Sequence, residues 1–256
     1  MTAFIAVALF APVLALPNPL TQNLSQDLRA PSIDHPFGQD KLGRDILSRV
    51  IYGARVSLLV GLLVVAMSAT IGLVIGGAAG YAGGRTDDVV MRGIDVLLAF
   101  PGILLAIGMS AVLGPSLRHV LLALCAIGWT GYARLVRAEV LAWRQSEFVS
   151  AAVALGATPR RIVRRHILPQ LLTPLLVQAT FGMAGAIVAE GSLSFLGLGV
   201  QPPTPSWGSM VNEGRSFLLV APHVALFPGM AIAGTVLGLN LLAEGLRDVL
   251  DVRTHE

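Results

Sequence analysis

The chain has 256 residues, of which 54% are hydrophobic and only 13% are charged, whereas an ordinary soluble domain carries about a quarter charged residues. This composition excludes a soluble globular protein and indicates one integral membrane unit, long enough for roughly six spans of about 20 residues. The net charge is only +3, and seven of the 18 Lys and Arg residues fall between Arg134 and Arg165. The basic residues therefore reflect membrane topology and not nucleic-acid binding.

Two residue types exclude further kinds of chemistry. Lys41 is the sole lysine and lies in D-K-L-G, so the sequence has no phosphate-binding loop of the G-x-x-x-x-G-K-[ST] type. Cys125 is the only cysteine and lies in an apolar run, which excludes an intrachain disulfide and a cysteine metal cluster.

The chain opens with a short apolar run over residues 3–16, which no basic residue precedes. We interpret residues 1–16 as a first transmembrane helix whose cytoplasmic lead-in is missing or very short. A cleaved signal peptide is the alternative, but it needs a positive n-region and a small-residue cleavage site. Residues 17–55 follow as an extracytoplasmic loop and an amphipathic lead-in helix at the membrane surface. The apolar residues of this helix recur at helical spacing: Ile46, Leu47, Val50, Ile51 and Ala54. The polar residues lie on the opposite side: Arg44, Asp45, Ser48, Arg49, Tyr52 and Arg55.

Three residues with metal-ligating or catalytic side chains, His35, Asp40 and Asp45, lie at or just before this helix. A metal or hydrolase site would need a second histidine nearby at ligand spacing, and this segment has none. We therefore expect these side chains to serve folding or docking, and we expect no metal site.

The second span is expected over residues 56–81, at the start of a core that covers residues 56–256 and holds five transmembrane helices. Four glycines recur there at intervals of four residues: Gly72, Gly76, Gly80 and Gly84. On a helix they form a ridge without side chains, which lets two helix backbones approach closely in lipid. The alternative is that glycine is simply common in membrane helices.

The third span is expected over residues 89–113. Pro101 lies inside it and is predicted to kink the helix, because proline removes a backbone hydrogen bond. Asp88, Arg92 and Asp95 are spaced to pair on one helix face, and we expect Asp95 to pair with Arg92 near the cytoplasmic surface.

Three further spans are expected over about residues 117–137, 171–189 and 222–243. With six spans, both termini lie on the side of the basic cluster between the fourth and fifth spans. That side carries 11 Lys and Arg residues and the other side seven, so the positive-inside rule makes it cytoplasmic.

Near the span ends, three residues have more than one interpretation. Glu190 lies at the predicted outer end of the fifth span, where an ionisable residue is a candidate for the substrate pathway. It could equally lock the loop that follows, or simply lie at the interface. Trp129 and Trp207 suit interfacial anchoring better than ligand stacking.

The most informative segment is the polar insert E-F-V-S-A-A-V-A-L-G-A-T-P-R-R-I-V-R-R-H-I-L-P, residues 147–169. Ser146 is a suitable N-cap and Gly156 a suitable C′ residue for a first helix, and Thr158 with Pro159 starts a second. We expect two short helices at a sharp angle, parallel to the membrane. Small residues on the first would permit docking into the groove of a partner. A basic loop that only sets topology is the alternative.

This insert resembles a known family. A-A-x-x-x-G at residues 151–156, followed by H-I-L-P at residues 166–169, resembles the cytoplasmic loop of permease subunits of ABC importers, whose coupling helix seats in a cleft of the ATPase. Ser150 stands where the family usually has glutamate, and Glu147 could substitute for it. Within a coupling loop over residues 139–170, the resemblance assigns ATPase coupling to Glu147, Ser150, Ala151, Ala152, Gly156, Arg160, His166 and Pro169.

Two further stretches narrow the resemblance to the dipeptide, oligopeptide and nickel class. H-P-F-G-Q-D-K-L-G-R-D-I-L-S-R, residues 35–49, is similar to an extracytoplasmic signature of that class, with Gln39 where threonine is more usual. L-S-F-L-G-L-G-V-Q-P-P-T-P-S-W-G, residues 193–208, is similar to the segment after its fifth span. The resemblance extends over nearly everything from His35 to Arg253.

The resemblance implies an all-α membrane protein with the type I ABC importer permease fold, six transmembrane helices and a coupling helix between the fourth and fifth. It implies a non-catalytic subunit of a bacterial inner membrane that forms the pathway for di- or oligopeptides, or alternatively for nickel or a metal chelate. The implied partners are a second permease, two ATP-binding subunits that hold ATP and Mg²⁺, an extracytoplasmic solute-binding protein and the lipid bilayer. This chain would bind no cofactor and no nucleic acid.

Two other classes stand against this interpretation. An ion-coupled secondary transporter would need charges within the membrane, for which Asp95 and Glu190 are the clear candidates. An intramembrane enzyme would need a paired nucleophile and base on facing helices, and the sequence offers no such pair.

Overall fold

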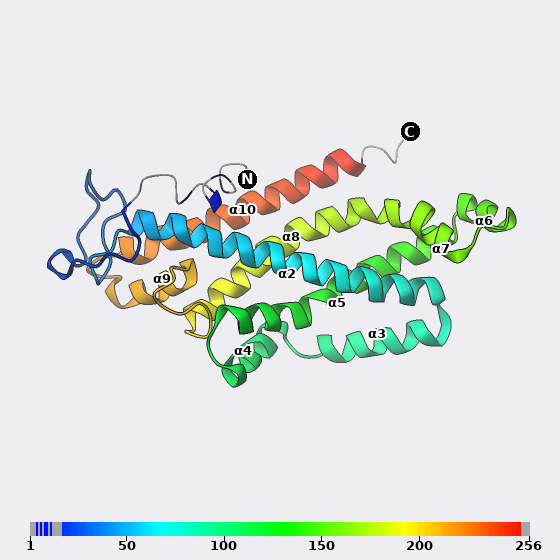
Figure 1. The fold of residues 1–256 in the computed structure, drawn as a ribbon, viewed down its shortest axis with the longest axis horizontal. Coiled ribbons are helices and arrows are strands. Elements are labelled where there is room, and N and C mark those ends of the chain that lie inside the picture. Colours follow the sequence, from blue (N-terminus) through cyan, green and yellow to red (C-terminus); the bar gives the residue numbers. More distant parts are fainter. Residues whose placement is uncertain (1–3, 5, 7, 10, 12–16, 252–256) are drawn as a thin grey trace.

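The computed structural model describes the chain except residues 1–3, 5, 7, 10, 12–16 and 252–256, and its fold is an elongated bundle of helices (Figure 1). Long helices α2, α5, α8 and α10 run along its length. The elements, in chain order, are η2 (Leu24–Gln26), α2 (Ile46–Ala82), α3 (Gly84–Leu98), α4 (Gly102–Leu113), α5 (Leu117–Arg144), α6 (Glu147–Ala154), α7 (Pro159–Ile162), the π-helical turn η3 (Val163–Ile167), α8 (Leu168–Phe195), α9 (Trp207–Gly214), η4 (Arg215–Phe217) and α10 (His223–Asp251).

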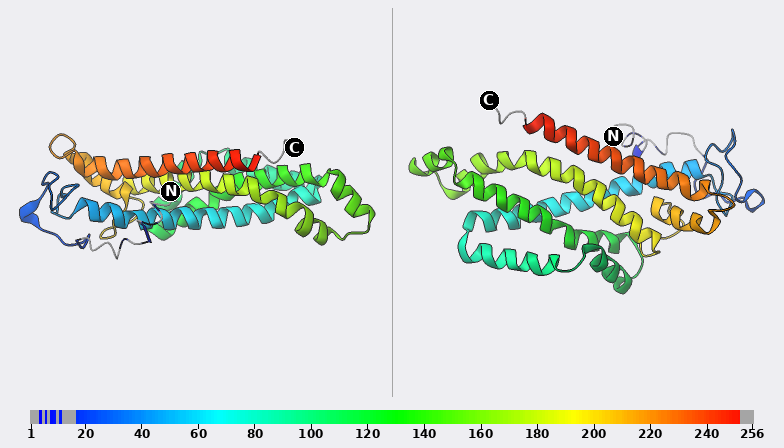
Figure 2. Two further views of the ribbon diagram at one scale, coloured as in Figure 1. Left: turned by 90° about the horizontal axis from the view of Figure 1, so that it is seen from above. Right: turned by 180° about the vertical axis from the view of Figure 1, so that it is seen from behind.

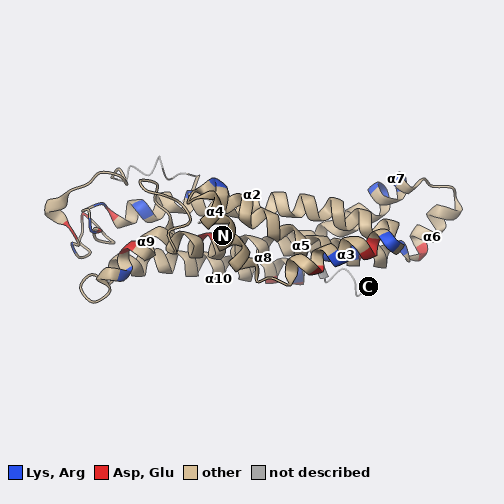
Figure 3. Ribbon diagram, turned by 90° about the horizontal axis from the view of Figure 1, so that it is seen from below, with Lys and Arg blue, Asp and Glu red and all other residues tan. Residues whose placement is uncertain are grey.

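The two ends of the bundle carry different segments (Figure 2). Residues 17–45 and α9 lie at one end, which we call the α9 end, and α6 and α7 lie at the other, the α6 end. Charged residues gather toward both ends, and the middle of the bundle is mostly uncharged (Figure 3). This distribution fits a bundle whose middle lies in lipid.

Four of the described helices are long and apolar enough to cross a membrane: Ile46–Ala82, Leu117–Arg144, Pro159–Phe195 and His223–Leu250. The α3–α4 pair makes a fifth span if its two helices are counted together. The predicted first span, over residues 1–16, lies largely outside the described residues.

The third predicted span is broken at Pro101 rather than merely kinked. Its two halves, α3 and α4, meet at an angle of 75°. Proline disfavours helical geometry in the residue before it and cannot donate a backbone hydrogen bond, so α3 ends at Leu98 and α4 begins at Gly102.

The charges of α3 pair with another helix, which corrects the expected pairing of Asp95 with Arg92. Asp95 forms an ion pair with Arg134 of α5. About two turns away on α3, Asp87 receives two hydrogen bonds from Arg137, with 2.6 Å between Arg137 Nη2 and Asp87 Oδ2. These ion pairs fix α3 against α5.

Residues 46–55, predicted as an amphipathic lead-in helix, are the first turns of α2 itself. Asp45 caps this helix and accepts a hydrogen bond from the Ser48 amide at 2.7 Å. No helix-breaking residue follows, and the polar residues expected to face the membrane surface pack inward: Arg44, Asp45, Ser48 and Arg49 are all buried. Their ion-pair and hydrogen-bond partners in the residue 17–45 segment and in α9 offset part of the cost of this burial.

Trp207 is a core residue and not the interfacial anchor expected from sequence. Its side chain is 2% exposed, and its indole nitrogen donates a hydrogen bond to the Val50 carbonyl at 2.8 Å. It therefore ties α9 to α2. Trp129 is half-buried and donates to Ala126 within its own helix.

The glycines of α2 lie against α5. A Cβ added to Gly72 would lie 2.8 Å from the Ala133 nitrogen, and one added to Gly76 would lie 2.8 Å from the Ala133 Cα. Gly80 is similarly close to Arg137, with 3.2 Å to its Cα. Gly84 does not belong to this ridge, because α2 ends at Ala82 and a Cβ on Gly84 would meet nothing within 4 Å.

Candidate functional site

The polar insert folds as a helix and a tight turn. Helix α6 runs from Glu147 to Ala154, after Ser146 in extended conformation. Gly156 follows with φ +78°, a left-handed conformation that glycine adopts without strain. Thr158 then precedes Pro159, the first residue of α7.

The second half of the insert is not a separate helix parallel to the membrane. Residues from Pro159 to Phe195 form one continuous helical segment, in which the π-helical turn Val163–Ile167 joins α7 to α8. Residues 155–158 separate α6 from this segment. No glycine separates the arginine-rich turns from the fifth span, and the π-helical turn directly precedes Pro169, which cannot donate a backbone hydrogen bond.

The insert is anchored to the bundle by apolar packing. Val149 of α6 and Ile162 of α7 are buried in one cluster with side chains of α5 and α8. The ring of Phe148 lies between Trp143 and His166, at centroid distances of 5.9 and 6.3 Å. The insert is therefore a packed extension of α5 and α8.

Most of the exposed residues of α6 are apolar or small. Leu155, at its end, has 89% of its side chain exposed, and Val153 and Phe148 are exposed as well. The sequence-predicted coupling residues are distributed over this surface and the turn behind it. Glu147, Ser150, Ala151, Gly156, Arg160 and Pro169 are exposed, and Ala152 and His166 are half-buried.

Glu190 lies in the last turns of α8 and is 1% exposed. Ser194 Oγ donates to Glu190 Oε1 at 2.6 Å and accepts a hydrogen bond from the Val200 amide at 3.1 Å. Ser194 thus links the carboxyl group to the loop that follows α8. Glu190 does not line the cavity between α2, α4, α5 and α8 that is described below.

A network of buried charges at the α9 end was missed by sequence reasoning. Asp40 accepts from Arg44 Nε at 2.7 Å and forms a second ion pair with Arg49. Arg44 also contacts Glu213 of α9 at 2.8 Å. Nearby, His35 Nδ1 lies 2.9 Å from Asp45 Oδ1. The spacing of Asp40 and Arg44 was visible in the sequence, but Glu213, 169 residues further along, had no local signal.

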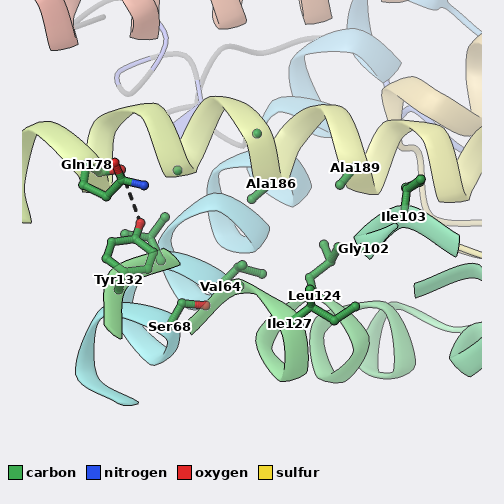
Figure 4. Close-up of a pocket in the computed structure, with 14 residues that line it drawn as sticks. Val64, Ser68, Gly102, Ile103, Leu124, Ile127, Tyr132, Gln178, Ala186 and Ala189 are labelled. Atoms are coloured by element: carbon green, nitrogen blue, oxygen red, sulfur yellow. Dashed lines mark hydrogen bonds between the residues drawn. The ribbon is translucent and has the colours of Figure 1, made fainter. Parts of the chain in front are cut away.

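A cavity of about 280 Å³ lies between α2, α4, α5 and α8 (Figure 4). Its walls are mostly apolar, and polar groups come from Ser68, Tyr132 and Gln178. Tyr132 Oη donates to the Gln178 carbonyl at 3.4 Å.

Known proteins share this architecture. An inward-facing structure of the MetNI methionine ABC transporter matches with a TM-score of 0.56 at 19% sequence identity, covering 75% of this chain and 94% of that chain. The fold is therefore that of an ABC transporter permease, an all-α integral membrane protein. The sequence identifies the family more closely. Residues 72–256 match the binding-protein-dependent transport system inner membrane component family, and the chain belongs to it.

Three relatives agree with this assignment. The dipeptide transport system permease protein DppC of Alkalihalophilus pseudofirmus is 46% identical over 98% of this chain and 83% of its own length. A putative peptide transport system permease protein of Brucella suis is 47% identical over 97% of this chain and 84% of its own length. The glutathione transport system permease protein GsiD of Escherichia coli is 48% identical over 86% of this chain and 73% of its own length. The chain is a membrane transport component of this family.

Proposed function

We propose that this chain is a permease subunit of an ATP-driven importer that carries di- or oligopeptides across a bacterial inner membrane. The supporting observation is the agreement among the relatives. Their names specify dipeptide, peptide or glutathione transport, at 46–48% identity over most of this chain. In this proposal a second permease completes the pathway, two ATPase subunits supply the energy, and a binding protein delivers the peptide.

The proposed contact with the ATPase is the outward surface of α6. Exposed apolar residues such as Leu155 and Val153 lie at the tip of the bundle, beside the small residues Ala151 and Gly156. Small side chains let a partner's surface approach the helix backbone, and exposed apolar side chains gain free energy when a groove covers them. This end is then the cytoplasmic end, with both termini on its side of the membrane and the α9 end outside. Glu147, Arg160, His166 and Pro169 would flank or support the contact.

The test uses Leu155→Asp in the importer expressed with its neighbouring genes. Because Leu155 is 89% exposed, the substitution should leave the fold intact while placing an unpaired charge in the ATPase groove. Leu219→Asp is the matched control, since Leu219 is fully exposed at the opposite end. We expect the ATPase to co-purify with the Leu219→Asp control as it does with the wild type. With Leu155→Asp, we expect the recovery of the ATPase and the vanadate-sensitive ATP hydrolysis to fall at least about tenfold. Equal recovery with both variants would contradict the proposed contact.

Gly156→Trp is a second variant at this surface, which we expect to insert into the membrane and to lose transport. Because Gly156 has φ +78°, any side chain there also strains the turn. Gly156→Ala separates the two effects, since it introduces the strain with little bulk.

A further inference from the structure

The central cavity contains a buried polar group without a partner. Ser68 is 1% exposed and lines the cavity from α2 (Figure 4). Its hydroxyl oxygen is buried and has no hydrogen-bond partner. Gly128 of α5 makes room for it, because a Cβ there would lie 2.7 Å from Ser68 Oγ. An unpaired buried hydroxyl costs free energy, so this group is suited to a ligand that enters the cavity.

One wall of the cavity is formed by small residues of α8: Gly182, Gly185, Ala186 and Ala189. Their short side chains create the space between α8 and the facing helices. Gly185 is exposed, and a Cβ on it would meet nothing within 4 Å. It therefore lies at the mouth of the cavity.

The cavity continues into a surface groove. Ile103, Gly185 and Ala189 line both hollows, and the groove extends over α8 to Asn240 of α10. A ligand moving along this face of α8 would thus pass the mouth of the cavity. An apolar chamber with a few polar groups that fix orientation is the usual make-up of a small-ligand site.

We infer that this cavity is a side-chain subsite of the transport pathway, which rests on the proposed function as a peptide permease. It receives an apolar side chain of the passing peptide, while the Ser68 hydroxyl and the Gln178 amide hydrogen-bond the adjacent peptide backbone. A volume of about 280 Å³ lies at the lower limit of small-molecule pockets, so the site accepts one or two residues and not a whole oligopeptide. The chemistry recognised is an amide-containing ligand with an uncharged, apolar side chain.

The test fills the mouth of the cavity with Gly185→Leu and measures uptake by the complete importer in proteoliposomes. Gly131→Leu is the matched control, because Gly131 lies on α5 with open space at its Cβ and does not line the cavity. Labelled Leu-Leu and Gly-Gly are supplied in separate assays. We expect Gly185→Leu to lower Leu-Leu uptake at least about tenfold relative to Gly-Gly, as misfits of a methylene or more do in apolar pockets. The control should keep the wild-type ratio.

A second variant, Ser68→Ala, removes the hydroxyl without adding bulk and should lower the uptake of both dipeptides to a similar degree. If the Gly185→Leu importer takes up Leu-Leu and Gly-Gly in the wild-type ratio, the proposed subsite is wrong. The cavity would then be a site for a lipid acyl chain. Failure of the wild-type importer to take up Leu-Leu, Gly-Gly or any longer peptide would contradict the proposed function itself, so the two failures are distinguishable.

Discussion

Several charged side chains at the α9 end pair with one another in a buried network. Asp40, Arg44 and Arg49 are buried together, and Glu213 reaches them from α9. Two guanidinium groups share two carboxylates here, which offsets part of the cost of removing these charges from water. The network joins residues 17–45 to α9, and it places the extracytoplasmic segment of the proposed importer in one orientation.

Removal of Asp40 should therefore destabilise this end strongly. In Asp40→Ala, Arg44 and Arg49 would be left with Glu213 alone, and the loss of one partner from a buried ion pair costs about 3–5 kcal/mol. We expect a lower thermal unfolding midpoint in detergent and faster proteolysis within residues 17–45. Asp34→Ala is the control, because Asp34 is an exposed carboxylate of the same segment. Equal stability of the two variants would show that the network contributes little.

Among the helices, α2 and α5 bring their backbones close together. Gly72, Gly76 and Gly80 lie on the side of α2 that faces α5, and α5 is also the helix whose arginines hold α3. A helix that contacts both neighbours and leads directly into α6 is well placed to transmit movement from the α6 end into the spans.

Adjacent glycines of α2 provide a direct test of this packing. A Cβ on Gly76 would lie 2.8 Å from the Ala133 Cα, whereas one on Gly77 would lie 3.8 Å from its nearest neighbour, Val136 Cγ1. We expect Gly76→Ala to destabilise the protein by about 1–3 kcal/mol, because backbone atoms cannot move aside as a side chain can. Gly77→Ala should be neutral or stabilising by about 0.5–1 kcal/mol, from the higher helix propensity of alanine. Thermal unfolding in detergent measures both, and a milder effect at Gly76 than at Gly77 would refute the close contact.

For the molecule as a whole, the helical membrane fold and its family could be predicted from hydropathy and motif order. The first helix of the insert was also predictable, since Gly156 and the Thr158–Pro159 pair mark its end and the next start locally. Contacts between residues far apart in the sequence could not be predicted. The inward packing of Arg49 depends on Asp40 and Glu213, and the burial of Trp207 depends on a carbonyl 157 residues away. The central cavity was beyond prediction for the same reason, because four helices contribute to its walls.

The measurement that tests the central claim most directly is uptake by the reconstituted importer. The chain, its partner permease, the ATPases and the binding protein are placed in proteoliposomes, and a labelled dipeptide is supplied with and without ATP. We expect uptake that requires both ATP and the binding protein, and that unlabelled peptides inhibit but nickel does not. Uptake driven by a proton gradient without ATP, or nickel uptake that peptides leave unchanged, would contradict the account.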